Sequence, residues 1–343
     1  MKKIWINSLI VVAMGVFLVI LIFFTDGTEQ LIKMIKSVHY LWLLVSFSLM
    51  ILYWVFGACT IATLKRGILG KENNVGHSFK TVMIGQFFSA ITPFSTGGQP
   101  AQVYFMSKQN IDTGKATSIV IIKSAIYVTT LFIISFIFFI IRRVALTQQI
   151  PNFVLLFIIG SFSNLVLIVL YFLFLINRDV SEKIVILFLK VVSYFKKKEK
   201  RNVQKQFDRI EESLISFQEG FIIIVKEKFY FLLAYFFQIL QLISIFSVPV
   251  FLIRALEGSF YNPISVIAAT GLLMMIISLV PTPGTTGGSE GLGIFFFGKF
   301  FIHSPILSAI FLWRIITYYS TILFGGIFSL TTKLKIFSDI KND

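Results

Sequence analysis

The sequence predicts an all-α polytopic membrane protein with about six full transmembrane helices and two re-entrant, broken-helix hairpins. Of its 343 residues, 56% are hydrophobic and 14% are charged, whereas about a quarter of the residues in a soluble domain are charged. Six nearly charge-free segments are long enough to cross a hydrocarbon core of roughly 30 Å as helices. They are residues 4–24, 40–63, 116–141, 152–176, 229–253 and 305–330.

The basic residues predict the orientation of these spans. The run 4–24 is long for a signal peptide and no small-residue cleavage site follows it, so we expect a retained first span. With a cytoplasmic N-terminus, most of the 31 Lys and Arg residues fall on cytoplasmic segments, as the positive-inside rule requires. We therefore expect both termini in the cytoplasm. The net charge of +15 is explained by topology, and the basic run 196–201 suits anionic lipid; nucleic-acid binding is not expected.

Two further stretches, 81–106 and 262–298, begin as apolar helices and are then interrupted by Pro and Gly. The interruptions, at residues 92–100 and 281–291, match each other at an offset of 190 residues. Five positions are identical and one is similar. The pairs are Thr92 with Thr282, Pro93 with Pro283, Thr96 with Thr286, Gly97 with Gly287, Gly98 with Gly288, and Ser95 with Thr285.

The matched turns predict an inverted repeat within one transmembrane domain, residues 1–343. The first half is 4–176, a basic amphipathic connector on the cytoplasmic side is 177–228, and the second half is 229–335. If each broken segment returns to the side it entered from, the halves have opposite orientations, an arrangement typical of alternating-access transporters. If both segments cross fully, the termini still lie in the cytoplasm, and the charge distribution does not decide between these topologies.

Three ionisable residues fall inside the expected membrane core: Lys123, Glu290 and Arg314. A charge at the centre of a span costs about 2.5–3.5 kcal/mol on insertion scales, so each needs a partner or a function. An ion pair is one explanation. One carboxylate cannot neutralise two cations, however, and the surplus positive charge suits an anionic ligand.

The glycine pairs should precede the second half-helix of each hairpin, where free backbone N–H groups and the helix dipole favour a phosphate. The neighbouring Ser and Thr hydroxyls could cap these helices or donate to the ligand; the alternative is that Gly and Pro only build tight hairpins. The candidate substrate-binding residues are Ser95, Thr96, Gly97, Gly98, Gln99, Gln102, Lys123, Thr285, Thr286, Gly287, Gly288, Glu290 and Arg314.

The remaining polar residues of the core are expected to form interhelical hydrogen bonds more often than substrate contacts. They are Gln86, Gln238, Gln241 and Asn164, together with Gln99 and Gln102 from the first turn. We expect no catalytic residue, metal site or cofactor, because no nucleotide-binding or nucleophile motif is present. The single cysteine, Cys59, provides no disulfide framework.

The turns at 93–100 and 281–291 resemble the two characteristic turns of the lysylphosphatidylglycerol synthase transmembrane (flippase-like) family, and the resemblance extends from about residue 5 to 335. Members with a C-terminal synthase domain make lysyl-phosphatidylglycerol and move it between leaflets, which gives resistance to cationic antimicrobial peptides. The chain ends about ten residues after its last expected span, so we expect the translocating half without lysyltransferase activity. The resemblance implies a location in the bacterial plasma membrane.

Two departures from the family pattern remove charge from the expected site. Many relatives have Glu and Arg in the first turn, where this chain has Gln99 and Gln102. Many also have Arg followed by a carboxylate in the next span, where this chain has Lys123 with no acid nearby. Lysyl-phosphatidylglycerol is therefore one candidate substrate beside phosphatidylglycerol and glycolipid or isoprenoid-linked lipids.

We therefore expect a lipid flippase that moves an anionic or zwitterionic headgroup between leaflets. Its phosphate would lie between the two Gly-Gly turns, neutralised by Lys123 and Arg314, with Glu290 paired to one cation in the empty site. The alternatives are a secondary transporter of a small anion and a lipid-modifying transferase with Glu290 as its base. A membrane phospholipid is the expected partner; a homo-oligomer and a separate lipid-modifying enzyme stay open.

Overall fold

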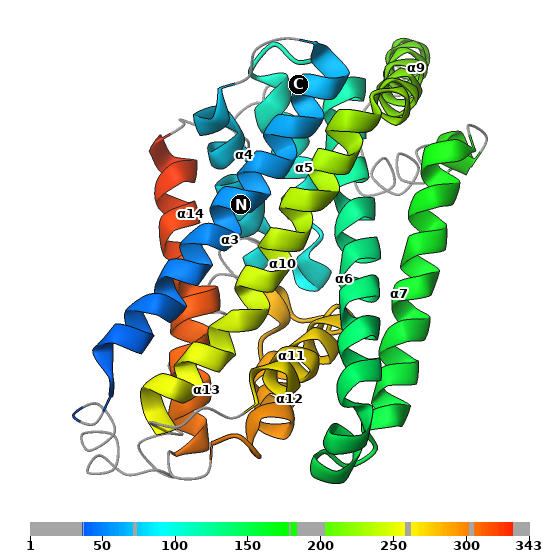
Figure 1. Cartoon of the computed structure of the whole chain (residues 1–343). Helices are drawn as coiled ribbons and strands as arrows, with labels where there is room; N and C mark the ends of the chain where they lie inside the picture. Colours follow the sequence, from blue (N-terminus) through cyan, green and yellow to red (C-terminus); the bar gives the residue numbers. More distant parts are fainter. Residues whose placement is uncertain are drawn as a thin grey trace.

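The computed structural model describes residues 36, 38–70, 74–177, 180–183, 203–257, 262–301 and 305–331. The expected span 4–24, the basic run 196–201 and both termini lie outside the described residues. Within the described part the regular elements are all helices, packed as one bundle (Figure 1).

Five long helices have the length and composition of membrane spans. The chain is therefore a multi-pass, all-α membrane protein, as the sequence predicts. The five are α3 (Tyr40–Leu69), α6 (Thr113–Gln149), α7 (Phe153–Ile176), α10 (Lys228–Glu257) and a rod made of α13 (Ile306–Arg314), a π-helical turn (Ile315–Tyr319) and α14 (Ser320–Thr331).

The two interrupted stretches form helical hairpins. The first consists of α4 (Val75–Ala90), a 3₁₀ turn (Pro93–Ser95) and α5 (Gly98–Ser107); the second consists of α11 (Pro263–Ile277), a 3₁₀ turn (Pro283–Thr285) and α12 (Gly288–Phe297). The first helix of each begins with an Asn whose side chain accepts backbone N–H groups: Asn74 for α4 and Asn262 for α11. This capping satisfies donors that a helix start otherwise leaves unpaired.

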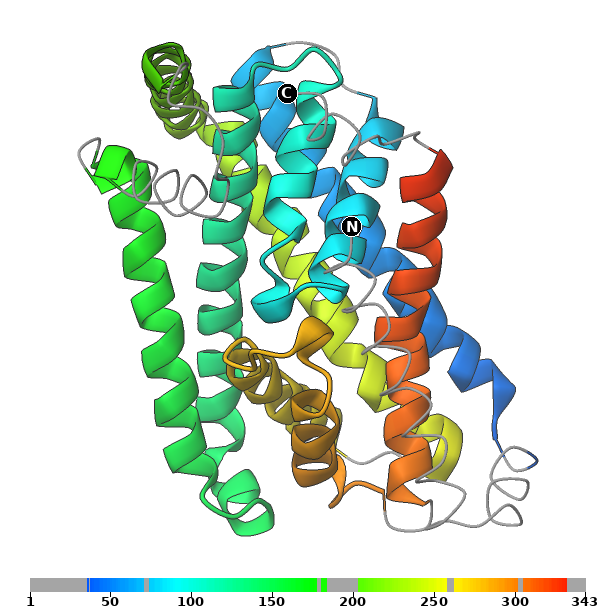
Figure 2. The same ribbon diagram turned by 180° about the vertical axis from the view of Figure 1, so that it is seen from behind.

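The hairpins enter the bundle from opposite ends and meet in the middle (Figures 1 and 2). Their two 3₁₀ turns pack against each other. Each limb alone is too short to cross a bilayer, because ten to sixteen residues rise only about 15–24 Å as helix. The two limbs of each hairpin also pack against each other, α4 on α5 and α11 on α12, so each segment folds back toward the end of the bundle from which it entered. This arrangement supports the re-entrant topology, which the charge distribution left undecided, over two full crossings.

Helices α3 and α10, which precede the hairpins, run antiparallel along each other. The His39 N–H donates to the Ala255 carbonyl at 2.9 Å, so the start of α3 lies at the end of α10. Farther along, a Cβ at Gly57 would lie 2.6 Å from Nε2 of Gln241, so the absence of a side chain allows close approach. This antiparallel pair gives the two halves opposite directions.

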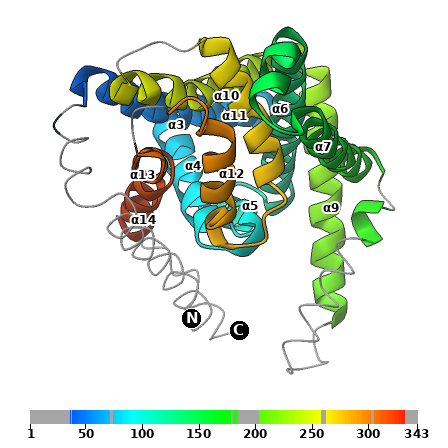
Figure 3. The same cartoon turned by 90° about the horizontal axis from the view of Figure 1, so that it is seen from below.

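Each hairpin also packs on the helix that follows the hairpin of the other half, which we call the closing helix: α4 packs on α14, and α11 packs on α6. Glycines permit both contacts, since a Cβ at Gly325 would lie 2.7 Å from the Met83 carbonyl oxygen and one at Gly271 would lie 2.7 Å from Ser135 Oγ. Seen from below, the hairpin helices occupy the centre of the bundle (Figure 3). Because each hairpin packs on a helix of the other half, the two turns are held together at mid-depth.

The described part of the connector contains helix α9 (Val203–Lys226), which packs on α6 and leads into α10. Its side chains Leu214, Phe217 and Ile224 are buried. We expected an amphipathic segment on the membrane or against the bundle, and α9 lies against the bundle at one end (Figure 1). Helix α9 therefore lies outside the centre of the bundle, which the hairpins occupy.

Candidate functional site

The two hairpin turns have the same internal hydrogen bonds, so the sequence repeat is a structural repeat. In the first turn the Thr96 hydroxyl donates to the Pro93 carbonyl at 2.9 Å, and in the second the Thr286 hydroxyl donates to the Pro283 carbonyl at 2.9 Å. In both turns the backbone N–H of the same Thr donates to that carbonyl at 3.2 Å. Proline fixes the start of the turn, and the hydroxyl closes it.

Two consecutive residues at each tip adopt the left-handed backbone region. They are Phe94 and Ser95 in the first turn, with φ of 52° and 55°, and Gly284 and Thr285 in the second, with φ of 56° and 57°. Non-glycine residues pay about 1 kcal/mol or more for this conformation. The first turn therefore holds a more strained backbone than the second, at the point where the tips meet.

Helices α5 and α12 begin at Gly98 and Gly288, which confirms that the glycine pairs precede the second half-helices. We considered that Ser95, Thr96, Thr285 and Thr286 could cap these helices or donate to a ligand. The Thr96 and Thr286 hydroxyls instead donate inside their own turns. At the first turn, the Gly97 N–H donates to Thr92 Oγ1 at 2.8 Å instead.

At the second turn, the Gly287 N–H donates to Glu290 Oε2 at 2.6 Å. A carboxylate three residues into a helix is well placed for such a cap. Glu290 therefore occupies the helix end at which we expected a phosphate. By contrast, no described residue accepts a hydrogen bond from the backbone N–H of Gly98 or Gln99, so the start of α5 retains free donors.

The second glycine of each pair is needed for packing within its own hairpin. A Cβ at Gly98 would overlap the Ser89 hydroxyl and lie 2.6 Å from the Gly85 carbonyl oxygen. A Cβ at Gly288 would lie 2.6 Å from the Val280 side chain. These contacts favour the alternative in which the glycines build tight hairpins.

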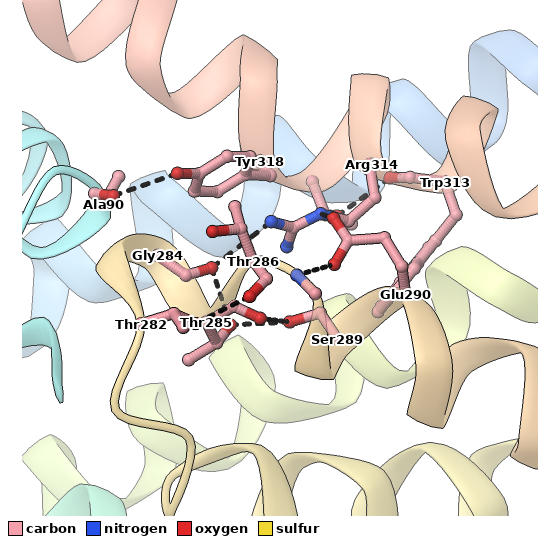
Figure 4. Close-up of polar contacts among 12 residues, drawn as sticks. Ala90, Thr282, Gly284, Thr285, Thr286, Ser289, Glu290, Trp313, Arg314 and Tyr318 are labelled. Atoms are coloured by element: carbon pink, nitrogen blue, oxygen red, sulfur yellow. Dashed lines mark hydrogen bonds and ion pairs between the residues drawn. The ribbon is translucent and has the colours of Figure 1, made fainter. Parts of the chain in front are cut away.

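Arg314 joins the second turn to the closing helix (Figure 4). Its Nε lies 2.9 Å from Glu290 Oε1, and both side chains are only 6% exposed. Its Nη2 donates to the Gly284 carbonyl at 3.2 Å, and its guanidinium lies 3.8 Å from the centroid of the Tyr318 ring. The Tyr318 hydroxyl donates to the Ala90 carbonyl of the first hairpin at 3.0 Å. Arg314 is thus neutralised, and its cluster connects the two halves.

Lys123 has a different environment from Arg314. It is partly buried on α6 and has no hydrogen-bond or ion-pair partner among the described residues. Its neighbour Ser124 accepts a hydrogen bond from Gln99 Nε2 at 2.9 Å, and Tyr171 on α7 accepts another at 3.0 Å. A cation in an apolar span with no internal counter-charge is costly, so the site favours an external anion.

The Lys123 side chain borders a cavity of about 590 Å³ beside the first turn. Seven of the predicted site residues line it: Ser95, Thr96, Gly98, Gln99, Gln102, Lys123 and Thr285. A second cavity of about 200 Å³ shares Ser95 and Thr285 and is bordered by Arg314. Five predicted residues line neither cavity: Gly97, Thr286, Gly287, Gly288 and Glu290.

Sequence reasoning missed several hydroxyl groups in the cavity walls. The missed residues are Tyr53, Ser89, Ser124, Tyr127, Tyr171 and Ser278. Lys123 and Tyr127 are four residues apart and so lie on one helix face, a spacing that could have indicated Tyr127. Gln86, Gln241 and Asn164, which we expected to form interhelical bonds, also line the cavity. No cluster of three or more metal-ligating side chains occurs in the described part of the chain.

Two broken-helix hairpins meeting at mid-depth beside a polar cavity define a multi-pass membrane protein of the inverted-repeat class. Residues 5–325 match the family described as "Lysylphosphatidylglycerol synthase TM region", and the chain belongs to this family. It is 28% identical over 314 residues to a "UPF0104 membrane protein" of Archaeoglobus fulgidus, covering 90% of this chain and 91% of that protein. No solved structure matches.

Proposed function

We propose that this protein moves a phospholipid between membrane leaflets, with the headgroup phosphate bound in the larger cavity beside Lys123. The observation that carries the proposal is the unpartnered Lys123 ammonium in that cavity. An anionic headgroup would supply the counter-charge that the described residues do not.

The free N–H groups at the start of α5 support the same position for the phosphate. Gly98 and Gln99 border the cavity, and their backbone donors lie at a helix N-terminus, where the dipole favours anions. Lys123 and this helix end would therefore bind one phosphate together.

The ion pair of Arg314 and Glu290 has a second role in the proposal. Because each neutralises the other, the pair adds no net charge to the site. It connects the second turn to the closing helix, and through Tyr318 it reaches the first hairpin. In this proposal Arg314 and Glu290 hold the two turns in position, and Lys123 binds the phosphate.

The hairpins themselves supply a route for translocation. They enter from opposite ends and their turns pack against each other, so rocking of one half against the other would expose the cavity alternately to each side. The headgroup would cross through the polar cavity while the acyl chains stay in the bilayer.

A lipid-modifying transferase is the less favoured alternative. Acyl transfer needs a general base within reach of its substrate, and no carboxylate or histidine stands among the described residues that line either cavity. Glu290, the base that this alternative would use, accepts from Gly287 and pairs with Arg314.

Reconstitution in liposomes tests the proposal. Leaflet exchange of tail-labelled phosphatidylglycerol should be fast with the unmodified protein, and Lys123→Gln should slow it at least about tenfold, because a buried charge partner is lost. Lys115→Gln, at the first turn of the same helix and outside the cavity walls, should exchange lipid normally.

Lipid exchange no faster than in empty liposomes, or equal exchange rates for Lys123→Gln and the unmodified protein, would refute the proposed flippase function. Uptake of inorganic phosphate into the lumen would instead support the small-anion transporter.

A further inference from the structure

We infer that the larger cavity selects a phospholipid headgroup with one negative charge and several hydroxyl groups, and discriminates against headgroups that carry an ammonium group. This inference rests on the proposed function and names the substrate class. Its observations are the charge of the cavity walls and the orientation of the amide side chains in them.

The walls of the cavity carry one cation and no anion. Lys123 is the only Lys, Arg, Asp or Glu among the described residues that line it. A single phosphodiester would balance this charge. An aminoacyl or amino headgroup would bring a second cation close to Lys123, and no carboxylate in the described walls could receive it; like charges at such an interface are strongly disfavoured.

Two glutamine side chains present their carbonyl oxygens as free acceptors. Gln99 donates through Nε2 to Ser124 and Tyr171 at 2.9 and 3.0 Å. Gln86 donates through Nε2 to the Tyr53 hydroxyl at 3.0 Å. The amide groups are thus held by their donors, and no described residue donates to either Oε1.

Asn164 on α7 is oriented in the same way, since its Nδ2 donates to the Gly160 carbonyl at 2.9 Å. Gln241 on α10 also lines the cavity, but its Oε1 is enclosed by protein and has no hydrogen-bond partner among the described residues. The amide oxygens that stay open to a ligand are therefore those of Gln86, Gln99 and Asn164.

Hydroxyl groups fit these acceptors without adding charge. Three of the five amide side chains in the walls, Gln86, Gln99 and Asn164, donate their N–H groups within the protein and leave their oxygens without a donor from the described residues, so hydroxyl donors on a ligand would complement them. Ammonium groups are donors as well, but they are repelled by Lys123. A glycerol or sugar hydroxyl satisfies both conditions, and a volume of about 590 Å³ falls within the roughly 300–1,000 Å³ of pockets that hold small organic molecules.

Competition between lipids tests this selectivity separately from transport. In detergent, the purified protein is titrated with phosphatidylglycerol, lysyl-phosphatidylglycerol and phosphatidylcholine, with thermal stabilisation as the readout. Phosphatidylglycerol should bind on the order of tenfold more tightly than the other two, because only it matches the single charge and the acceptors. Lys123→Glu should reverse the preference toward lysyl-phosphatidylglycerol.

A glutamine in the cavity walls and one outside them test the role of the free acceptors. Gln99→Leu should weaken phosphatidylglycerol binding several-fold, because it removes an acceptor that borders the cavity. Gln238→Leu is the control: Gln238 is fully buried, its amide atoms have no partner among the described residues, and it lies outside the cavity walls. It should bind lipid normally.

The outcomes separate the selectivity from the proposed function. Equal affinity for the three lipids, a preference for an ammonium lipid, or equal effects of the two glutamine variants would overturn the selectivity. Binding with the expected selectivity but without leaflet exchange would refute translocation and leave the selectivity standing. Glycerophosphoglycerol, the soluble headgroup, should compete poorly; competition equal to that of the lipid would identify a soluble anion as the ligand.

Discussion

The Arg314–Glu290 ion pair predicts a large coupling energy in a double-mutant cycle. The pair lies 2.9 Å apart with both side chains only 6% exposed, so each charge depends on the other for its neutralisation. Arg314→Met leaves the carboxylate with the Gly287 N–H as its remaining donor. Glu290→Gln leaves the guanidinium with the Gly284 carbonyl and the Tyr318 ring.

The structure sets the size of each effect. Removing one member of a buried pair costs about 3–5 kcal/mol, because an uncompensated charge remains. Stacking on an aromatic ring offsets about 2 kcal/mol when the cation is desolvated, so Glu290→Gln should cost about 1–3 kcal/mol and Arg314→Met about 3–5 kcal/mol. The double variant leaves no buried charge, so it should cost less than the sum of the two by about 2 kcal/mol or more.

The assay is equilibrium unfolding in mixed micelles of mild detergent and sodium dodecyl sulfate, with the four proteins measured side by side. A coupling energy below about 0.5 kcal/mol, the level expected of independent sites, would show that the two charges do not neutralise each other. It would also remove the reason for assigning the surplus positive charge to Lys123 alone.

The same unfolding assay checks three further predictions. Gly98→Ala should destabilise by about 1–3 kcal/mol through overpacking against α4, whereas Gly291→Ala, with open space around its Cβ, should stabilise by about 0.5–1 kcal/mol; equal effects would contradict the packing account. Gly284→Ala should destabilise by about 1–3 kcal/mol, because its φ of 56° is left-handed and its Cβ would overlap the Tyr318 ring. The reverse change at the matching position, Phe94→Gly, should be neutral or stabilising, and destabilisation by Phe94→Gly would show that the backbone strain is misassigned. Tyr318→Phe should cost about 0.5–1.5 kcal/mol for its hydrogen bond to the first hairpin; no loss would mean that this bond does not connect the halves.

The sequence was sufficient for the fold class and for the places where the helices break. Charge-free runs predict spans because lipid solvates only apolar side chains, and five of the six lie in the described part as long apolar helices. The matched turns predict α5 and α12 from Gly98 and Gly288. Re-entrant hairpins were predicted from the two interrupted, matched segments, but full crossings could not be excluded, because short half-helices and tilted crossings share one hydropathy pattern.

The cavity was predicted only in part, for reasons of distance and backbone conformation. Lys123 and Gln99 stood out as polar residues in apolar surroundings. The partners Ser124 and Tyr171 did not, because their hydroxyls meet Gln99 across helices that are far apart in the sequence. Thr92 accepts the Gly97 N–H through a local turn that repeat matching alone does not resolve.

The two hairpins enter from opposite sides of the membrane and meet beside the cavity in the proposed transport mechanism, and cysteine accessibility tests this arrangement directly. In a Cys59→Ala background, single cysteines are placed at the two ends of each hairpin, at Val75 or Lys108 for the first and at Ile264 or Lys299 for the second. A membrane-impermeant thiol reagent is applied to sealed vesicles of either orientation. We predict that the first pair reacts from one side and the second pair from the opposite side. Reaction of the two ends of one hairpin from opposite sides would show a full crossing and contradict the account.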